Sequence, residues 1–176
     1  KQEEIMKLSE KMIKDVIKEF CGEKLDKFEV IDWHDAMEEY GCDKPDLRIP
    51  LKLKEISDLV MNEEFKVFSD PAKKEGSRVV ALKVPNGNTM SRGQIDDYTK
   101  FVSKLGAKGL AYIKINDVKD LENGIQSPIL KFLNKKTIQN IFKTLEVKTD
   151  DLIFFGAGSE SVSYTHLTLP TKWIVG

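Results

Sequence analysis

The sequence predicts an α+β protein in which helices pack over a small mixed β-sheet. About four short segments have the apolar alternation or the continuous apolar run of β-strands, and amphipathic segments with helical spacing lie between them. Capping residues and glycines stand at the ends of several segments, which indicates where one element stops and the next begins.

The bulk composition is that of an ordinary soluble globular protein, with 40% hydrophobic and 32% charged residues in a chain of 176. This length allows one sizeable core, or one domain with part of another. No apolar run is long enough to cross a bilayer, and the charged first residues do not form a secretory signal. Because the chain does not start with Met, we expect it to be a piece of a longer protein.

The first predicted element is an amphipathic helix that ends at Gly22. Its apolar residues recur at helical spacing and include Ile5, Leu8, Met12, Val16 and Phe20. The same helix carries a row of lysines that, taken alone, would fit a stripe that binds nucleic acid: Lys7, Lys11, Lys14 and Lys18. Acidic residues lie three or four positions from these lysines, so we favour a solvated face instead.

The remaining elements follow from local spacing and capping residues. Between residues 28 and 61 we expect an extended piece at 28–31, a helix over 33–40 capped by Asp32 and ended by Gly41, and a helix over 54–61. Further strands are expected at 65–68, 78–84, 110–115 and 151–155, the last apolar throughout, as in a strand buried on both faces. Further helices are expected from the Ser91 cap to Gly106, after the Ser127–Pro128 pair, and over 136–145.

Residues 40–48, Tyr-Gly-Cys-Asp-Lys-Pro-Asp-Leu-Arg, are predicted to form a stiff charged loop rather than a helix. Pro45 fixes its own φ and pushes Lys44 into an extended conformation. On composition alone, such a loop is a solvated turn.

Charge and cysteine content exclude several classes of function. The formal net charge is −1, so no global field attracts nucleic acid. Nearly all the positive charge is lysine, and Arg48, Arg78 and Arg92 are the better candidates for specific contacts because a guanidinium group is a planar fork of donors. Cys21 and Cys42 are far apart and the histidines do not cluster, so we expect free thiols in a reducing compartment and no zinc site.

The chain contains no phosphate-binding loop, no HExxH and no GxSxG motif. On its own residues it has no convincing active site, and binding is the expected role.

The last part of the chain breaks the preceding pattern. From about Val162 onward, the run Val-Ser-Tyr-Thr-His-Leu-Thr-Leu-Pro-Thr matches the translation of an adaptor sequence used in DNA library preparation. We therefore expect residues 161–176 to be a non-native tail and assign no functional role to His166 or Trp173.

The loop at 40–48 closely resembles the run that follows the second class-defining motif of bacterial-type aspartyl-tRNA synthetases, which are class II enzymes. Other segments resemble the same family in the family's order, among them Glu64-Phe-Lys-Val-Phe68, and the runs at 81–85, 91–96, 106–113, 127–133 and 151–156. They correspond to the GAD domain, which is inserted between the second and third motifs and is shared with a subunit of tRNA-dependent amidotransferases. The resemblance implies a partial catalytic-domain segment at 1–48 and a GAD-like insertion domain at 49–160.

The resemblance also implies a function for the parent protein, an aspartate–tRNA ligase. Such an enzyme activates aspartate with ATP and Mg²⁺ and transfers it to the 3′ end of tRNA(Asp) during translation. The second-motif loop that holds ATP and the glycine-rich third motif have no counterpart in the chain. We therefore expect no catalytic residue, metal site or bound ATP in the chain, and no aminoacylation by it. The family further implies a cytoplasmic homodimer whose partners are the tRNA acceptor end, aspartate and ATP, with no membrane or DNA partner.

Two sets of candidate site residues follow from the resemblance and from charge. Asp43, Lys44, Asp46 and Arg48 are expected to form a charge network at the junction with the catalytic core, on the rim of the active site. Lys83, Arg92 and Lys108 are candidate contacts to tRNA phosphates, because A-form grooves present shape rather than readable bases. Each of these cations would otherwise be an ordinary solvated side chain.

Two alternatives stay open at this point. The chain could be the GAD binding module of a tRNA-dependent amidotransferase subunit, although its opening loop and preceding helix resemble the synthetase. It could also be a stand-alone α+β interaction domain whose pattern matches by chance.

Overall fold

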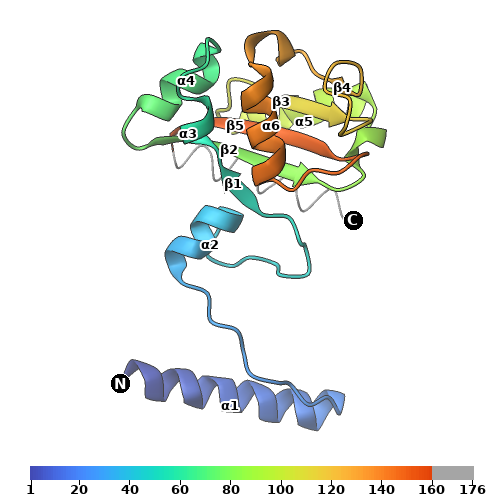
Figure 1. Cartoon of the computed structure of the whole chain (residues 1–176). Helices are drawn as coiled ribbons and strands as arrows, with labels where there is room; N and C mark the ends of the chain where they lie inside the picture. Colours follow the sequence, from blue (N-terminus) through green and yellow to red (C-terminus); the bar gives the residue numbers. More distant parts are fainter. Residues whose placement is uncertain (160–176) are drawn as a thin grey trace. The chain divides into compact units, whose positions relative to one another are not determined.

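A computed structural model describes residues 1–159 of the chain (Figure 1). It contains two compact units, and the division between them in the chain falls between Asp32 and Trp33. The non-native tail predicted at 161–176 lies outside the described residues.

The first unit is built on helix α1, Gln2–Cys21, which ends at Gly22 with φ of 71°, as its apolar spacing and terminal glycine predicted. No residue of α1 is buried within the described structure, and its apolar stripe, from Ile5 to Phe20, is exposed. The polar side is partly neutralised, as expected: Lys14 Nζ lies 2.7 Å from Glu10 Oε1. The hydrogen bond from Lys14, followed by that from the Phe28 backbone N–H, lowers the pKa of Glu10.

The second unit holds the remaining elements. In chain order they are α2 (Trp33–Tyr40), β1 (Leu53–Glu55), α3 (Ser57–Val60), α4 (Lys66–Lys73), β2 (Ser77–Val84), η1 (Gly87–Thr89), α5 (Arg92–Lys104), β3 (Ala111–Ile115), β4 (Ile125–Gln126), η2 (Leu130–Phe132), α6 (Lys135–Thr144) and β5 (Leu152–Ser159).

The strands form one five-stranded sheet in the order β1-β2-β5-β3-β4. β2 and β5 pair along their whole length, from Ser77 opposite Ser159 to Val84 opposite Leu152. The α+β class is confirmed; all pairings among the described strands are antiparallel, whereas a mixed sheet was expected. β5 is buried from Leu152 to Gly156, which confirms the prediction of a strand covered on both faces.

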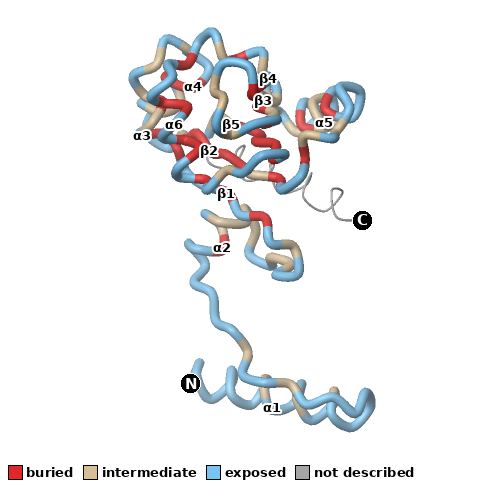
Figure 2. The backbone as a smooth tube through the Cα atoms, turned by 45° about the vertical axis from the view of Figure 1, so that its right-hand side comes forward, coloured by how far each residue is buried: buried red, intermediate tan, exposed pale blue. Residues whose placement is uncertain are grey.

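The buried residues gather on the strands of the sheet and on the helices packed against it (Figure 2). Alternation along the strands divides them into two cores, one on each face of the sheet. One core joins Val79 and Ala81 of β2 to side chains of α3, α4 and α6. The other joins Val80 and Leu82 to α5 and to the segment before β1. The helices therefore cover the sheet unequally, with three on one face and α5 on the other.

Three local predictions are wrong. Residues 65–68 are not a strand but the start of α4, because Phe65 and Phe68 lie three residues apart on one helical side with ring centroids at 4.8 Å. The helix expected over 54–61 is the short strand β1 followed by α3. The helix expected after Pro128 is a single 3₁₀ turn, η2.

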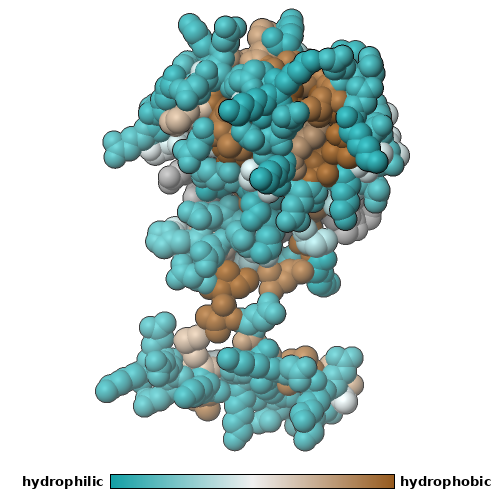
Figure 3. All heavy atoms as spheres, in the orientation of Figure 1, coloured by the Kyte–Doolittle hydropathy of each residue, from teal (hydrophilic) through white to brown (hydrophobic). Residues whose placement is uncertain are grey.

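The face of the molecule in Figure 3 is mainly hydrophilic, with apolar atoms exposed in patches. In the second unit, the exposed large apolar side chains include Trp33, Val67 and Phe132. None of the described helices combines the length and apolar character needed to span a bilayer.

Candidate functional site

The charged loop between α2 and β1 holds one tight pair among its four predicted residues. Arg48 donates from Nε to Asp46 Oδ1 at 2.9 Å and from Nη2 to Asp46 Oδ2 at 2.6 Å. The Arg48 backbone N–H also donates to Asp46 Oδ1 at 3.1 Å, which closes a compact turn after Pro45. The Asp46 hydrogen bond raises the pKa of Arg48, and the bidentate geometry orients the exposed guanidinium group.

Asp43 and Lys44 are exposed and are not joined to that pair. Within residues 1–159, neither side chain makes a hydrogen bond or an ion pair. The structure therefore brings together Asp46 and Arg48 and leaves Asp43 and Lys44 facing solvent. A junction role for these four residues stays a prediction.

The three candidate phosphate contacts lie on different elements of the second unit. Lys83 belongs to β2, where its Nζ donates to the backbone carbonyl of Glu146 at 3.0 Å. Arg92 is the first residue of α5 and Lys108 lies in the turn after it, and both are exposed. Since α5 has 13 residues, these two cations are separated by about 20 Å of helix. They could contact separate phosphates of an extended backbone, but they do not form one anion site.

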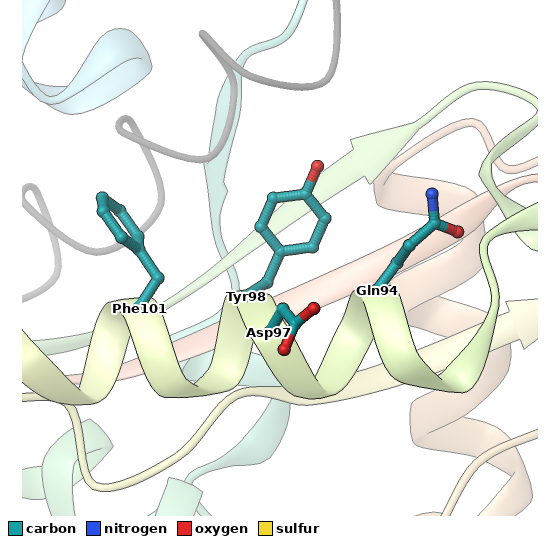
Figure 4. A pocket seen from close by; sticks show the side chains of 4 residues that line it. All are labelled: Gln94, Asp97, Tyr98 and Phe101. Atoms are coloured by element: carbon teal, nitrogen blue, oxygen red, sulfur yellow. The ribbon is translucent and has the colours of Figure 1, made fainter.

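One side of α5 lines a pocket of about 270 Å³. Gln94, Tyr98 and Phe101 project from one side of the helix, and Asp97 lies beside them (Figure 4). Tyr98 also packs edge-on against Phe154 in the core, with ring centroids 6.2 Å apart, so it is half-buried. Asp97 accepts a hydrogen bond from Lys100 at 3.0 Å. The described side chains that line the pocket thus offer two aromatic rings and an amide as contacts for a ligand.

The chemistry of the described side chains gives no set suited to a metal ion. Across residues 1–159, no three His, Cys, Asp or Glu side chains come together. Asp117 and Asp120 lie in the loop between β3 and β4, where their carboxylates accept backbone N–H groups of that same loop. The acidic residues there act as turn-forming groups.

A comparison with protein families identifies the second unit. The model of the GAD domain matches residues 68–167, more than half of the chain. The chain belongs to the GAD-domain family. This domain is the insertion domain of aspartyl- and glutamyl-tRNA synthetases and of amidotransferase subunits. Lys83, Arg92, Lys108 and the α5 pocket lie within the matched residues, and the charged loop precedes them.

One residue that holds the second unit together is a buried arginine of β2. Arg78 is 5% exposed, and its Nη2 donates to the backbone carbonyl of Glu38 in α2 at 3.1 Å. Its Nη1 lies 3.7 Å from Glu55 Oε2 in β1. The sequence marked Arg78 as a candidate for specific contacts, but its partners lie 40 and 23 positions away in the chain, beyond any local pattern.

Two further polar contacts were missed by the sequence analysis. Lys114 of β3 donates from Nζ to the Asn88 carbonyl at 3.1 Å and also to the Met90 carbonyl, so it closes the loop before α5. Glu63 accepts the Asn134 backbone N–H at 3.0 Å and the Thr137 hydroxyl at 2.5 Å, which fixes the start of α6. The apolar alternation of β3 does not indicate which backbone carbonyls Lys114 binds. The sequence around Glu63 likewise does not indicate that its carboxylate binds the start of α6.

Proposed function

We propose that the chain is part of a bacterial-type aspartate–tRNA ligase, in which the GAD domain is the insertion that covers the active site and reaches the tRNA acceptor end. The observation that carries this proposal is the GAD match at 68–167, which follows the loop at 40–48 in the chain. That loop resembles the synthetases, whereas the GAD domain alone is shared with amidotransferase subunits. A homodimeric, cytoplasmic parent belongs to the same proposal.

Under this proposal, ATP and Mg²⁺ bind to the rest of the parent enzyme. The ground is the sequence: the second-motif loop that holds ATP and the glycine-rich third motif have no counterpart in this chain. Aspartate activation is therefore assigned to the rest of the catalytic domain, and no step of it is assigned to the residues of this chain.

The first experiment compares charging of tRNA(Asp) with radioactive aspartate by the isolated chain and by the full-length parent. We expect turnover by the parent and none above background by the chain, since the activating groups are missing. Turnover by the isolated chain would contradict the assignment of chemistry to the rest of the protein. Lack of aspartate charging by the parent would contradict the proposed function itself.

A second experiment tests the contact with tRNA through its salt dependence. Counterion release makes the logarithm of the binding constant fall linearly with the logarithm of the salt concentration. We expect Arg92→Met and Lys108→Met in the parent each to lower the magnitude of that slope by about one. Lys74→Met, an exposed lysine after α4, is the matched control and should leave it unchanged. Equal slopes in all four proteins would remove both residues from the tRNA interface.

The GAD match also fits the alternative, a subunit of a tRNA-dependent amidotransferase. Sequencing the genomic DNA on both sides of this segment separates the two. Flanking second and third synthetase motifs support the ligase, and amidotransferase-type neighbours support the alternative. Family membership speaks against a stand-alone domain that matches by chance.

A further inference from the structure

Helix α2 depends on contacts from outside itself. It has eight residues, of which Ala36 alone is buried. A helix of this length is not stable in isolation, because its few hydrogen bonds do not offset the cost of ordering the first turn. The groups that hold α2 to the rest of the unit therefore decide whether it is ordered and where it lies.

Arg78 supplies such a group at the C-terminal end of α2. The last four carbonyls of a helix have no partner within it. One of them, that of Met37, accepts the Gly41 N–H at 2.9 Å. The next, that of Glu38, accepts a hydrogen bond from the guanidinium group of Arg78, near the start of β2. A positive charge at this end also interacts favourably with the helix dipole.

A second contact fixes the same end from the strand side. Lys52, just before β1, places its Nζ 2.5 Å from Glu39 Oε2 and 5.4 Å from the centre of the Tyr40 ring. The three consecutive residues at the end of α2 are thus each held, one by β2 and two by the segment entering β1. The charged loop begins immediately after them, at Gly41.

We propose that Arg78 is a positioning residue that fixes α2, and through it the charged loop at 41–48, to the sheet of the GAD domain. The Asp46–Arg48 pair is then carried as a fixed part of this domain. Arg78, which lies outside the loop, therefore sets the position of the loop relative to the sheet. This inference concerns the second unit itself and does not depend on which enzyme carries it.

Hydrogen exchange of the full 176-residue chain tests the proposal through the amides of α2, with that of Gly41 as the main reporter. Arg78→Met keeps much of the side-chain volume and removes all donors. A hydrogen bond to a charged group contributes enough that its loss should raise exchange in α2 by about tenfold to a hundredfold. Amides of the β2–β5 pairing should keep their protection. Arg78→Lys, which keeps the charge but not the fork, should give an intermediate increase.

Two controls separate positioning from general loss of structure. Arg92→Met makes the same chemical change at an exposed residue, the first of α5, and should leave hydrogen exchange in α2 unchanged. In a Trp173→Phe background, Trp33 in the first turn of α2 is the remaining tryptophan, and its fluorescence anisotropy should fall in Arg78→Met. A merely structural role would instead loosen the sheet and α2 together.

A surface variant keeps the proposal testable if Arg78→Met does not fold. Lys52→Met removes the second contact without touching a buried site, and it should raise exchange in the same α2 amides by a smaller factor. Unchanged α2 protection in the Arg78 and Lys52 variants would overturn the proposal. So would an equal loss of protection in α2 and in the β2–β5 pairing.

Discussion

Several cations of the second unit donate hydrogen bonds to backbone carbonyls. Arg78 reaches the Glu38 carbonyl, Lys83 reaches that of Glu146, and Lys114 reaches those of the loop before α5. Each satisfies an acceptor that the local backbone leaves unpaired. Counting lysines and arginines in the sequence therefore overestimates the number of cationic side chains that are free to contact a phosphate directly. Arg92 and Lys108 are better placed for such a contact than Lys83.

A single glycine fixes the loop between β3 and β4. The Gly124 carbonyl accepts the backbone N–H groups of Asn116 and Asp117 at 2.7 and 2.9 Å. A Cβ at Gly124 would lie 2.4 Å from the Asp117 carbonyl oxygen and 2.5 Å from that of Asp120. These are backbone atoms that cannot turn aside, so the loop would have to move.

We expect Gly124→Ala to lower the free energy of unfolding by about 1–3 kcal/mol, because the added methyl group overpacks a closed turn. Gly109→Ala is the matched control, since a Cβ there meets nothing within 4 Å. It should change stability by less than about 1 kcal/mol. Urea denaturation of both variants measures the difference, and equal midpoints would show that the loop adapts without cost.

At the scale of elements, the sequence predicted what local rules determine. The stripe of α1, the Ser91 cap of α5 and the apolar run of β5 were all recognisable from spacing and capping. β1 and β4 were missed because they have three and two residues, too few for alternation to stand out. The short apolar alternation at 65–68 predicted a strand. The packing of Phe68 against Phe155 of the sheet outweighed that pattern, and the segment starts α4 instead. Candidate site residues could be named from the sequence, but their partners depend on tertiary structure.

Helix α6 begins where a carboxylate from a distant segment completes its first turn. Asn134 caps the helix by accepting the Thr137 N–H at 2.8 Å. Glu63, 71 positions earlier, accepts the Asn134 N–H, so the cap itself is held. The carboxylate also lies at the positive end of the helix dipole.

We expect Glu63→Ala to lower the free energy of unfolding by about 1–3 kcal/mol, because it leaves the buried Thr137 hydroxyl without the carboxylate that accepts its hydrogen bond. Glu64→Ala removes a neighbouring exposed carboxylate and should change stability by less than about 0.5 kcal/mol. Thermal unfolding of the two variants gives the comparison. Equal melting temperatures would mean that water replaces the carboxylate fully.

At the scale of the whole molecule, the position of the domain boundary has a physical consequence. The resemblance to synthetases drew it between residues 48 and 49, at the charged loop. That boundary stays a prediction. The two compact units of the structure are divided in the chain between Asp32 and Trp33, so α2 and the loop fall in the unit that holds the sheet. Arg78 explains this division, because its buried guanidinium binds α2 directly.

Two truncations of the chain distinguish these boundaries. A chain starting at Trp33 loses only α1 and the segment after it, where no residue is buried, so its sheet should unfold at the same urea concentration as the full chain. A chain starting at Ile49 also loses the Glu38 acceptor and the packing of Ala36. The guanidinium group of Arg78 then becomes solvated, and we expect a loss of about 1.5–3 kcal/mol, the usual net contribution of a hydrogen bond to a charged group. Equal stability of the two truncated chains would place the boundary at the loop and would leave α2 as a separable appendage.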